Sequence, residues 1–255
     1  MIRYSTENRV GRIVIDRPEK RNALDQQMVS ELTQAFQRAA DDHEAKVIVL
    51  RANGEAFCAG ADLAYLQKLQ DFSFEENLAD SRNLMKLYHL IYTMPKVVIA
   101  QVEGHALAGG SGLVTVCDLA YAVPSAKFGY TEVKIGFIPA LVSVFLVRKI
   151  GEGKARELLL TGRVIQADEA ARLGMITQVV EKERVKAEVD TLVQQLVTTA
   201  SGASLAATKK LIDQVQGRSL SEALEYAARE NAAARATDDC KKGIAAFLQK
   251  EDLTW

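Results

Sequence analysis

Residues 102–132, VEGHALAGGSGLVTVCDLAYAVPSAKFGYTE, are the stretch that decides the fold. The apolar run at 97–100, just before it, has the length and composition of a short buried strand. After the small residues 108–112, apolar side chains recur at helical rather than alternating spacing over 113–117. We therefore predict a strand that runs through a small-residue turn into a helix.

The start of such a helix is suited to bind an anion, because its first amide groups have no acceptor within the helix and lie at the positive end of the helix dipole. Gly109 and Gly110 lack a Cβ, so another molecule can approach their backbone closely. Two N–H groups aimed at one carbonyl oxygen would stabilise an oxyanion or an enolate. A tight turn needed only for packing is the alternative, and it would be favoured if this turn stood alone.

A second segment of the same kind lies upstream. Residues 46–52 have the pattern of a strand, residues 55–61 form a loop rich in small residues, and Asp62 stands where an acid that caps the next helix would stand. Two such strand, loop and helix units can present two converging N–H groups, one from each unit.

A series of motifs follows the order and spacing of a known family. They are RPEKRNAL at 17–24, AFCAGADL at 56–63, GHALAGG at 104–110, CDLA at 117–120, AKFG at 126–129 with Glu132, GFIP at 136–139, and LTG at 160–162 followed by Ala167. Through these motifs the chain resembles the crotonase family, also called the enoyl-CoA hydratase/isomerase superfamily. The resemblance implies an α/β fold, with a crotonase-like spiral of ββα units and the active site in residues 1–183 and a helical, C-terminal trimerisation region in residues 184–255.

The composition is that of a soluble globular protein able to bury a core: of 255 residues, 48% are hydrophobic and 25% charged, with a formal net charge of -1. We find no membrane-spanning run and no leader pattern, so we expect a cytoplasmic protein. Interspersed charges of both signs argue against nucleic-acid binding. The three scattered cysteines lack metal-ligand spacing, so we expect neither a zinc site nor a disulfide framework.

The resemblance makes an acyl-CoA thioester the expected substrate. Because coenzyme A is then part of the substrate, no separate cofactor is expected. In the family the loop at 19–22 borders the coenzyme A nucleotide, so Lys20 and Arg21 would bind its phosphates; a solvated loop is the alternative. Cys58 has an alternative role as a small apolar filler. The residues that the resemblance places around the substrate are Ala23, Ala56, Cys58, Gly60, Ala61, Asp62, Leu63, Gly110, Gly112, Tyr130 and Pro139.

The C-terminal part has a helical pattern throughout. By resemblance, its helices assemble the chain into a homotrimer or a dimer of trimers. Phe247 and Lys250 lie in a segment that, in relatives, reaches the coenzyme of a neighbouring subunit, and a core position is the alternative for Phe247. The expected helices are 184–198, 203–215, 219–237 and 239–250.

The resemblance also implies the catalytic groups. The N–H groups of Ala59 and Gly109 would polarise the carbonyl of a 2-enoyl thioester, and Glu132 would move protons or hold the water. A carboxyl group that faces an apolar pocket would have a raised pKa, which suits general acid chemistry. Without the family context, Glu132 would be interpreted as a surface acid at the start of a helix.

Gly112 stands where two-glutamate hydratases of this family carry their second acid. Glu132 would then hold the water alone, with backbone groups near Gly112, with a neighbour such as Tyr130 or Ser111, or with the substrate itself. Alternatively no water is added, and a single acid moves a proton from C2 to C4, as in enoyl-CoA isomerases. A non-catalytic acyl-CoA-binding protein is the third possibility.

The segment after Pro139 departs from the family, because Ala-Leu-Val-Ser-Val-Phe replaces a glycine-rich sequence. The implied change is a bulkier apolar wall near the acyl end. Together with Glu132 and Gly136, this pattern looks like that of hydratases for methyl-branched, carboxyl-bearing substrates such as 3-methylglutaconyl-CoA. We therefore expect a hydratase rather than an isomerase.

Overall fold

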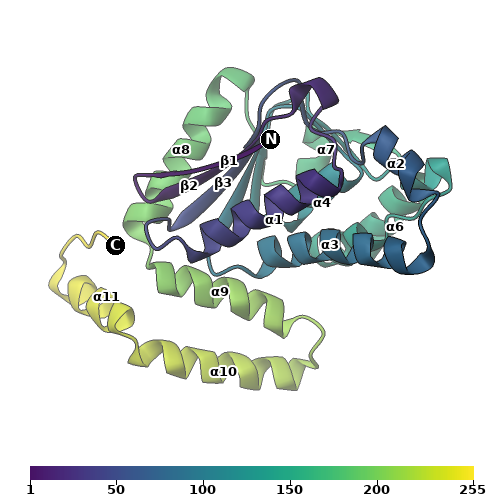
Figure 1. The fold of residues 1–255 in the computed structure, drawn as a ribbon. Coiled ribbons are helices and arrows are strands. Elements are labelled where there is room, and N and C mark those ends of the chain that lie inside the picture. Colours follow the sequence, from purple (N-terminus) through teal and green to yellow (C-terminus); the bar gives the residue numbers. More distant parts are fainter.

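The strands are divided between two sheets in a computed structural model that describes residues 1–255 (Figure 1). The larger sheet has the order β1 (Ile2–Glu7), β2 (Val10–Ile15), β3 (Val47–Ala52), β5 (Val97–Val102), β7 (Leu119–Ala122) and β10 (Gln178–Val179). The smaller sheet has the order β4 (Ala56–Cys58), β6 (His105–Leu107), β8 (Lys127–Gly129) and β9 (Val164–Gln166). The hairpin β1–β2 and the pair β8–β9 are antiparallel, and all other neighbours are parallel.

A unit of two strands followed by a helical segment repeats along the chain. Each of β3, β5 and β7 is followed by a short strand of the smaller sheet and then by a helical segment. These segments are α2 (Leu63–Leu69) with α3 (Phe74–Thr93), α4 (Gly109–Val116), and the 3₁₀ turn Glu132–Ile135 with α5 (Ala140–Ile150). The predicted spiral of ββα units is confirmed. The short strand β4 lies inside the predicted loop at 55–61, and β6 lies between the predicted strand at 97–100 and the small-residue turn at 108–112.

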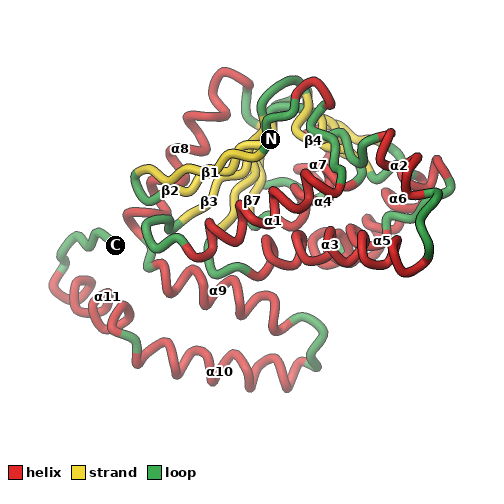
Figure 2. The backbone as a smooth tube through the Cα atoms, viewed as in Figure 1, coloured by secondary structure: helices red, strands yellow, loops and turns green.

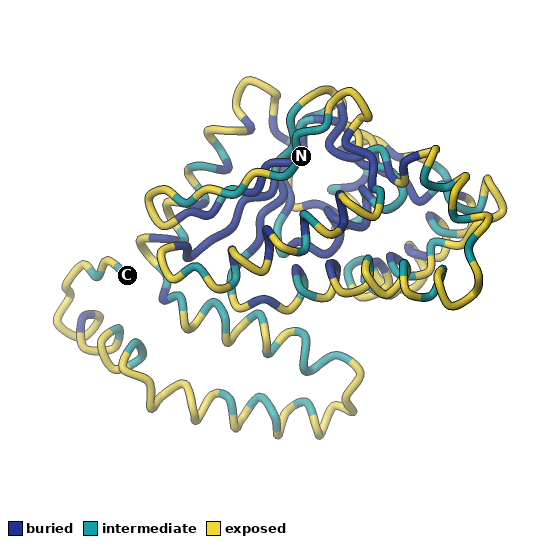
Figure 3. The backbone as a smooth tube through the Cα atoms, viewed as in Figure 1, coloured by how far each residue is buried: buried dark blue, intermediate teal, exposed yellow.

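Helices cover both faces of the larger sheet. The helix α1 (Gln26–Asp41) packs with α3 and against β1 and β2, whereas α8 (Lys182–Thr199) packs on β3, β5 and β7. Figure 3 shows the strands between them as buried backbone. Along α8 the buried residues Val185, Val189, Val193 and Val197 recur at every fourth position and join the main core. The helix that opens the predicted C-terminal region is therefore part of the core.

The last three helices form the C-terminal end of the chain, and only the first of them contacts the larger sheet, at β5. They are α9 (Gly202–Val215), α10 (Leu220–Ala236) and α11 (Asp238–Gln249), and Figure 2 shows that this part of the chain contains no strand. Among them only Ala246 is buried, while Leu220, Leu224, Ile244, Phe247 and Leu248 are exposed. Phe247 is 82% exposed in the single chain, so the alternative interpretation of Phe247 as a core residue is wrong there.

Two shorter helices, α6 (Glu152–Thr161) and α7 (Ala167–Arg172), complete the fold. None of the helices combines the length and the apolar character that crossing a membrane requires.

A buried lysine fastens α9 to the core. The Lys209 ammonium donates to the carbonyl oxygens of Ile91 and Lys96, both at 3.0 Å, and to Asp118 Oδ2 at 2.7 Å. Its side chain is 9% exposed. One side chain therefore ties α9 to the end of α3 and to the segments that lead into β5 and β7.

We expect Lys209→Met to lower the free energy of unfolding by about 2–4 kcal/mol, because it leaves Asp118 and two carbonyl groups without their donor. Urea denaturation at a fixed protein concentration measures this difference. The matched control is Lys210→Met, since the neighbouring Lys210 is exposed. Equal stability of the two variants would contradict this role for Lys209.

Candidate active site

Two backbone N–H groups without a hydrogen-bond acceptor lie just after the ends of β4 and β6. The N–H of Ala61, in the loop after β4, makes no hydrogen bond, and neither does the N–H of Gly109 in the first turn of α4. Ala59 N, by contrast, donates to Arg21 O at 3.1 Å. The prediction that Ala59 supplies the second donor is therefore wrong, because its N–H already has an acceptor. The free amide of this loop belongs to Ala61.

The two turns that carry these amides are in contact. A Cβ added to Gly60, whose φ is +94°, would lie 3.0 Å from Ala108 Cβ and 3.1 Å from Leu107 O. A Cβ on Gly110 would lie 2.2 Å from Cys58 O. The backbones thus approach as closely as glycine allows, and the free N–H groups of Ala61 and Gly109 lie at the same edge of the smaller sheet.

Ala108 holds the second turn in a strained conformation. Its φ of 47° and ψ of -121° are unfavourable for a residue with a Cβ. Ala108 N donates to Gly129 O at 2.7 Å, and the Ser111 hydroxyl donates to Ala106 O at 2.6 Å while it accepts from Gly129 N at 3.0 Å. These bonds fasten the turn to Gly129 of β8, which lies two residues before Thr131 and three before Glu132.

Glu132 begins the 3₁₀ turn after β8, and one oxygen of its half-buried carboxyl group lacks a partner. Its Oε2 atom is buried and makes no hydrogen bond. Burial raises the pKa of Glu132 above its usual value of 4.5. The same carboxylate, together with burial, contributes to the raised pKa of the Tyr88 and Tyr130 hydroxyls, so all three side chains lie close together. A buried carboxyl oxygen without a partner is rare outside functional sites.

The hydroxyl groups suggested as water holders are engaged within the protein. Tyr130 is fully buried, and its oxygen lies 2.5 Å from Thr115 Oγ1. Ser111 is also fully buried and makes the two hydrogen bonds given above. Both hydroxyl groups are therefore buried and bonded within the protein rather than directed at a water position, so the structure does not support that suggestion.

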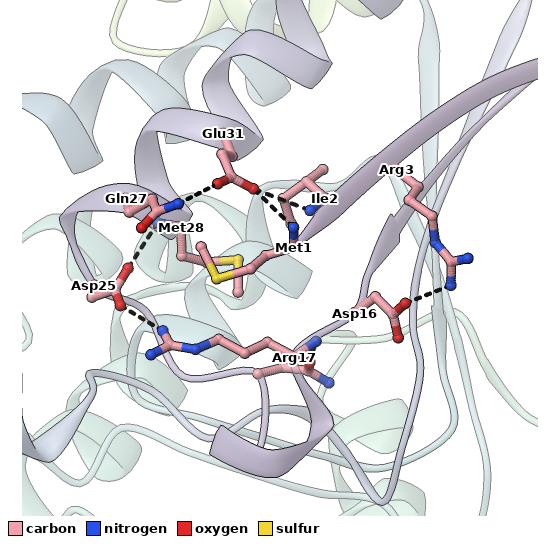
Figure 4. Close-up of polar contacts among 10 residues, drawn as sticks. Met1, Ile2, Arg3, Asp16, Arg17, Asp25, Gln27, Met28 and Glu31 are labelled. Carbon is pink, nitrogen blue, oxygen red and sulfur yellow. Dashed lines mark hydrogen bonds and ion pairs between the residues drawn. The ribbon is translucent and has the colours of Figure 1, made fainter.

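Asp62 and Arg17 organise the loop around Ala61. Asp62 caps α2 by accepting from Ala64 N at 2.9 Å, and its other oxygen lies 3.5 Å from the Arg17 guanidinium. Figure 4 shows that Arg17 also points to Asp25, which caps α1 by accepting from Met28 N at 2.8 Å. Arg17 thus joins the caps of two helices, a role that the sequence analysis missed.

Asn22 is a second organiser that the sequence did not reveal. It is fully buried, and its side chain donates to Asn53 O at 2.8 Å and to Ala56 O at 2.7 Å while it accepts from Arg17 N at 2.8 Å. An Asn that follows three charged residues in a predicted loop gives no sign in the sequence that it is buried. Its contacts hold the loop of Lys20 and Arg21 against β4.

The remaining predicted residues divide into three groups. Lys20, Arg21 and Leu63 are exposed beside the site, and Pro139 is half-buried at the start of α5. Cys58 is fully buried, and burial raises the pKa of its thiol to about 12, while Ala23 and Ala56 are also buried. Phe247 and Lys250, at α11, lie far from α2 and α4 in the same chain (Figure 1). No group of three or more His, Cys, Asp or Glu side chains is placed to hold a metal ion.

The fold and this pair of amides beside one acid are typical of enzymes that act on acyl-CoA thioesters. A family model described as enoyl-CoA hydratase/isomerase matches residues 5–255. A Thermus thermophilus protein, provisionally named enoyl-CoA hydratase, is 42% identical over 241 residues, which cover 94% of this chain and 95% of that protein. Crotonyl-CoA hydratase of Syntrophomonas wolfei is 33% identical over 96% of this chain and 93% of its own length.

Solved structures agree with the sequence comparisons. The crystal structure of an enoyl-CoA hydratase from Mycobacterium smegmatis matches with a TM-score of 0.93 at 30% identity, covering 100% of this chain and 98% of that one. The chain therefore belongs to the enoyl-CoA hydratase/isomerase family, and the predicted resemblance is confirmed.

We expect Glu132→Gln to stabilise the folded protein at neutral pH. A carboxyl group whose pKa is raised by folding contributes stability that is present at low pH and is lost as the pH rises through the folded-state pKa. The advantage of the variant should therefore shrink as the pH falls toward 4.5, the usual value for Glu. Urea midpoints across this range measure the effect, with exposed Glu7→Gln as control. A variant less stable than the wild type at neutral pH would contradict it.

Proposed function

We propose that this chain is an enoyl-CoA hydratase, which adds water across the 2,3 double bond of a 2-enoyl-CoA. The observation that carries the proposal is that Ala61, Gly109 and Glu132 follow the C-terminal ends of the neighbouring parallel strands β4, β6 and β8, where the two amides are free and one oxygen of Glu132 is buried without a partner. The names of the relatives support it.

In this reaction the thioester oxygen accepts hydrogen bonds from Ala61 N and Gly109 N. Negative charge develops on that oxygen when a nucleophile attacks C3, and fixed donors stabilise it without reorganising. One such donor contributes roughly 3–4 kcal/mol to the barrier in well-studied enzymes. The site binds the transition state better than the substrate because the charge is greater there.

Glu132 then moves one proton. Its carboxylate takes a proton from water while the water oxygen bonds to C3, and the electron pair of the double bond shifts onto the thioester oxygen. The protonated Glu132 delivers that proton to C2, the carbonyl re-forms, and a 3-hydroxyacyl-CoA leaves with the carboxylate regenerated. Substrate and water supply every atom, so the reaction uses no cofactor.

Lys20 and Arg21 would meet the phosphates of coenzyme A, since both are exposed beside the loop of Ala61. Phe247 and Lys250 would reach the coenzyme of a neighbouring subunit in a homotrimer or a dimer of trimers, which would also cover the exposed apolar residues of α9–α11. The apolar segment after Pro139 fits a branched acyl group such as that of 3-methylglutaconyl-CoA.

The single acid also fits a second candidate, an isomerase. Glu132 would remove a proton from C2 of a 3-enoyl-CoA, the two amides would hold the dienolate, and the same carboxyl would return the proton to C4. This reaction incorporates no water. The product is a conjugated 2-enoyl-CoA.

The test follows the absorbance of the conjugated thioester. Crotonyl-CoA and 3-methylglutaconyl-CoA should lose it in the presence of the protein, and ¹⁸O from labelled water should enter the product. We expect Glu132→Gln to lower kcat by roughly 10²–10⁴, the usual contribution of general acid–base catalysis. In the wild type the rate should fall at low pH, with a midpoint above 4.5, because the reaction starts from the ionised carboxylate.

Glu7→Gln is the control for this experiment, since Glu7 is exposed at the hairpin. Gain of conjugation from a 3-enoyl-CoA without ¹⁸O would assign the isomerase instead. Binding of acyl-CoA without turnover, unchanged in Glu132→Gln, would identify a non-catalytic acyl-CoA-binding protein.

A further inference from the structure

Tyr88 of α3 reaches the first turn of α4. Its side chain is fully buried, and its hydroxyl donates to Gly109 O at 2.8 Å. Its ring packs edge-on against Phe145 of α5, with centroids 6.2 Å apart and planes at 87°. Packing therefore fixes the ring, and the ring fixes the position of the hydroxyl.

The glycines of α4 make room for this hydroxyl. A Cβ on Gly109 would lie 3.2 Å from the Tyr88 oxygen, and a Cβ on Gly112 would lie 2.6 Å from it. The Cβ on Gly112 would also lie 2.5 Å from Val142 Cγ1. Positions 109 and 112 share one face of the helix. Tyr88 and Val142 thus fill the space in which the second acid of a two-glutamate hydratase would begin.

The same hydroxyl restrains the strained turn. The φ and ψ angles of Ala108 set the plane of the peptide that joins it to Gly109, and therefore the direction of the Gly109 N–H. An unfavourable conformation persists only where neighbours hold it from several sides. The bond from Ala108 N to Gly129 O holds the chain from β8, and the bond from Tyr88 to Gly109 O holds the following peptide, between Gly109 and Gly110, from α3. The chain is therefore held on both sides of the peptide that carries the Gly109 N–H.

We propose that Tyr88 is a positioning residue for the Gly109 amide, and that it has this role because it occupies the place of the missing second acid. The inference rests on the proposed function, since it requires the Gly109 N–H to meet a thioester oxygen. Tyr88 acts through Gly109: its buried hydroxyl donates to the backbone rather than to the substrate.

The first test is the kinetics of Tyr88→Phe with crotonyl-CoA. The variant keeps the ring and loses the hydrogen bond, so kcat should fall about tenfold, the effect of one hydrogen bond, while KM stays within about twofold. Tyr92→Phe is the matched control, because Tyr92 lies one turn along α3 and packs on the same Phe145 at 5.1 Å. It should keep the wild-type kcat. Circular dichroism verifies that both variants are folded.

The second test measures how strongly the site polarises the thioester carbonyl of a bound ligand. Cinnamoyl-CoA has a conjugated thioester that absorbs at longer wavelength than adenine, and polarisation of its carbonyl shifts this band to the red. When cinnamoyl-CoA binds to the Glu132→Gln variant, which does not turn it over, its absorbance band should show this red shift. Bound to the double variant with Tyr88→Phe, it should show a smaller shift at saturating ligand.

The outcomes separate this inference from the proposed function. A wild-type kcat and an undiminished red shift in the Tyr88 variants would overturn the role of Tyr88, while turnover by the wild type would leave the hydratase proposal intact. An equal loss of kcat in Tyr92→Phe would overturn it as well, because packing would then explain the effect. A wild type that does not turn over crotonyl-CoA, together with a Glu132→Gln variant that leaves the cinnamoyl-CoA band unshifted, would overturn both proposals.

Discussion

The close approach of two backbones, at Cys58 and Gly110, determines where the amide groups of the site lie. A side chain at Gly110 would meet Cys58 O at 2.2 Å, so the first turn of α4 can settle against β4 only because that position is glycine. The parallel pairing of β4 with β6, which includes a register shift between Ala56 and Cys58, brings the two turns to the same edge of the smaller sheet. The groups needed for the chemistry therefore belong to the main chain, and side chains such as Tyr88 and Ser111 hold that main chain in place.

Much of the fold could be predicted from the sequence because its long elements carry their own signals. The helix α1 shows an apolar stripe and begins at Asp25, and the hairpin and the C-terminal helices have equally clear patterns. The three-residue strands β4, β6 and β8 could not be predicted. Three residues are too few to show alternation, and their pairing joins segments far apart in the chain.

The sequence predicts which two loops form the site, but it does not predict which residues of those loops supply the N–H donors. Both small-residue turns were found, but the choice between Ala59 and Ala61 depends on Arg21 O, a contact from another part of the chain. Tyr88 gave no signal because its hydroxyl is one polar atom on a helix that otherwise shows packing residues. The buried state of Glu132 agrees with the apolar surroundings expected for it.

The burial of Cys58 beneath α4 has a practical consequence for chemical labelling. Burial raises the pKa of both Cys58 and Cys117 to about 12, so these thiols are almost entirely un-ionised at neutral pH and resist alkylation and oxidation. Cys240, in the first turn of α11, is only partly covered. A maleimide probe on the folded chain would thus attach beside the apolar residues of α11 and report on their surroundings without touching the catalytic half.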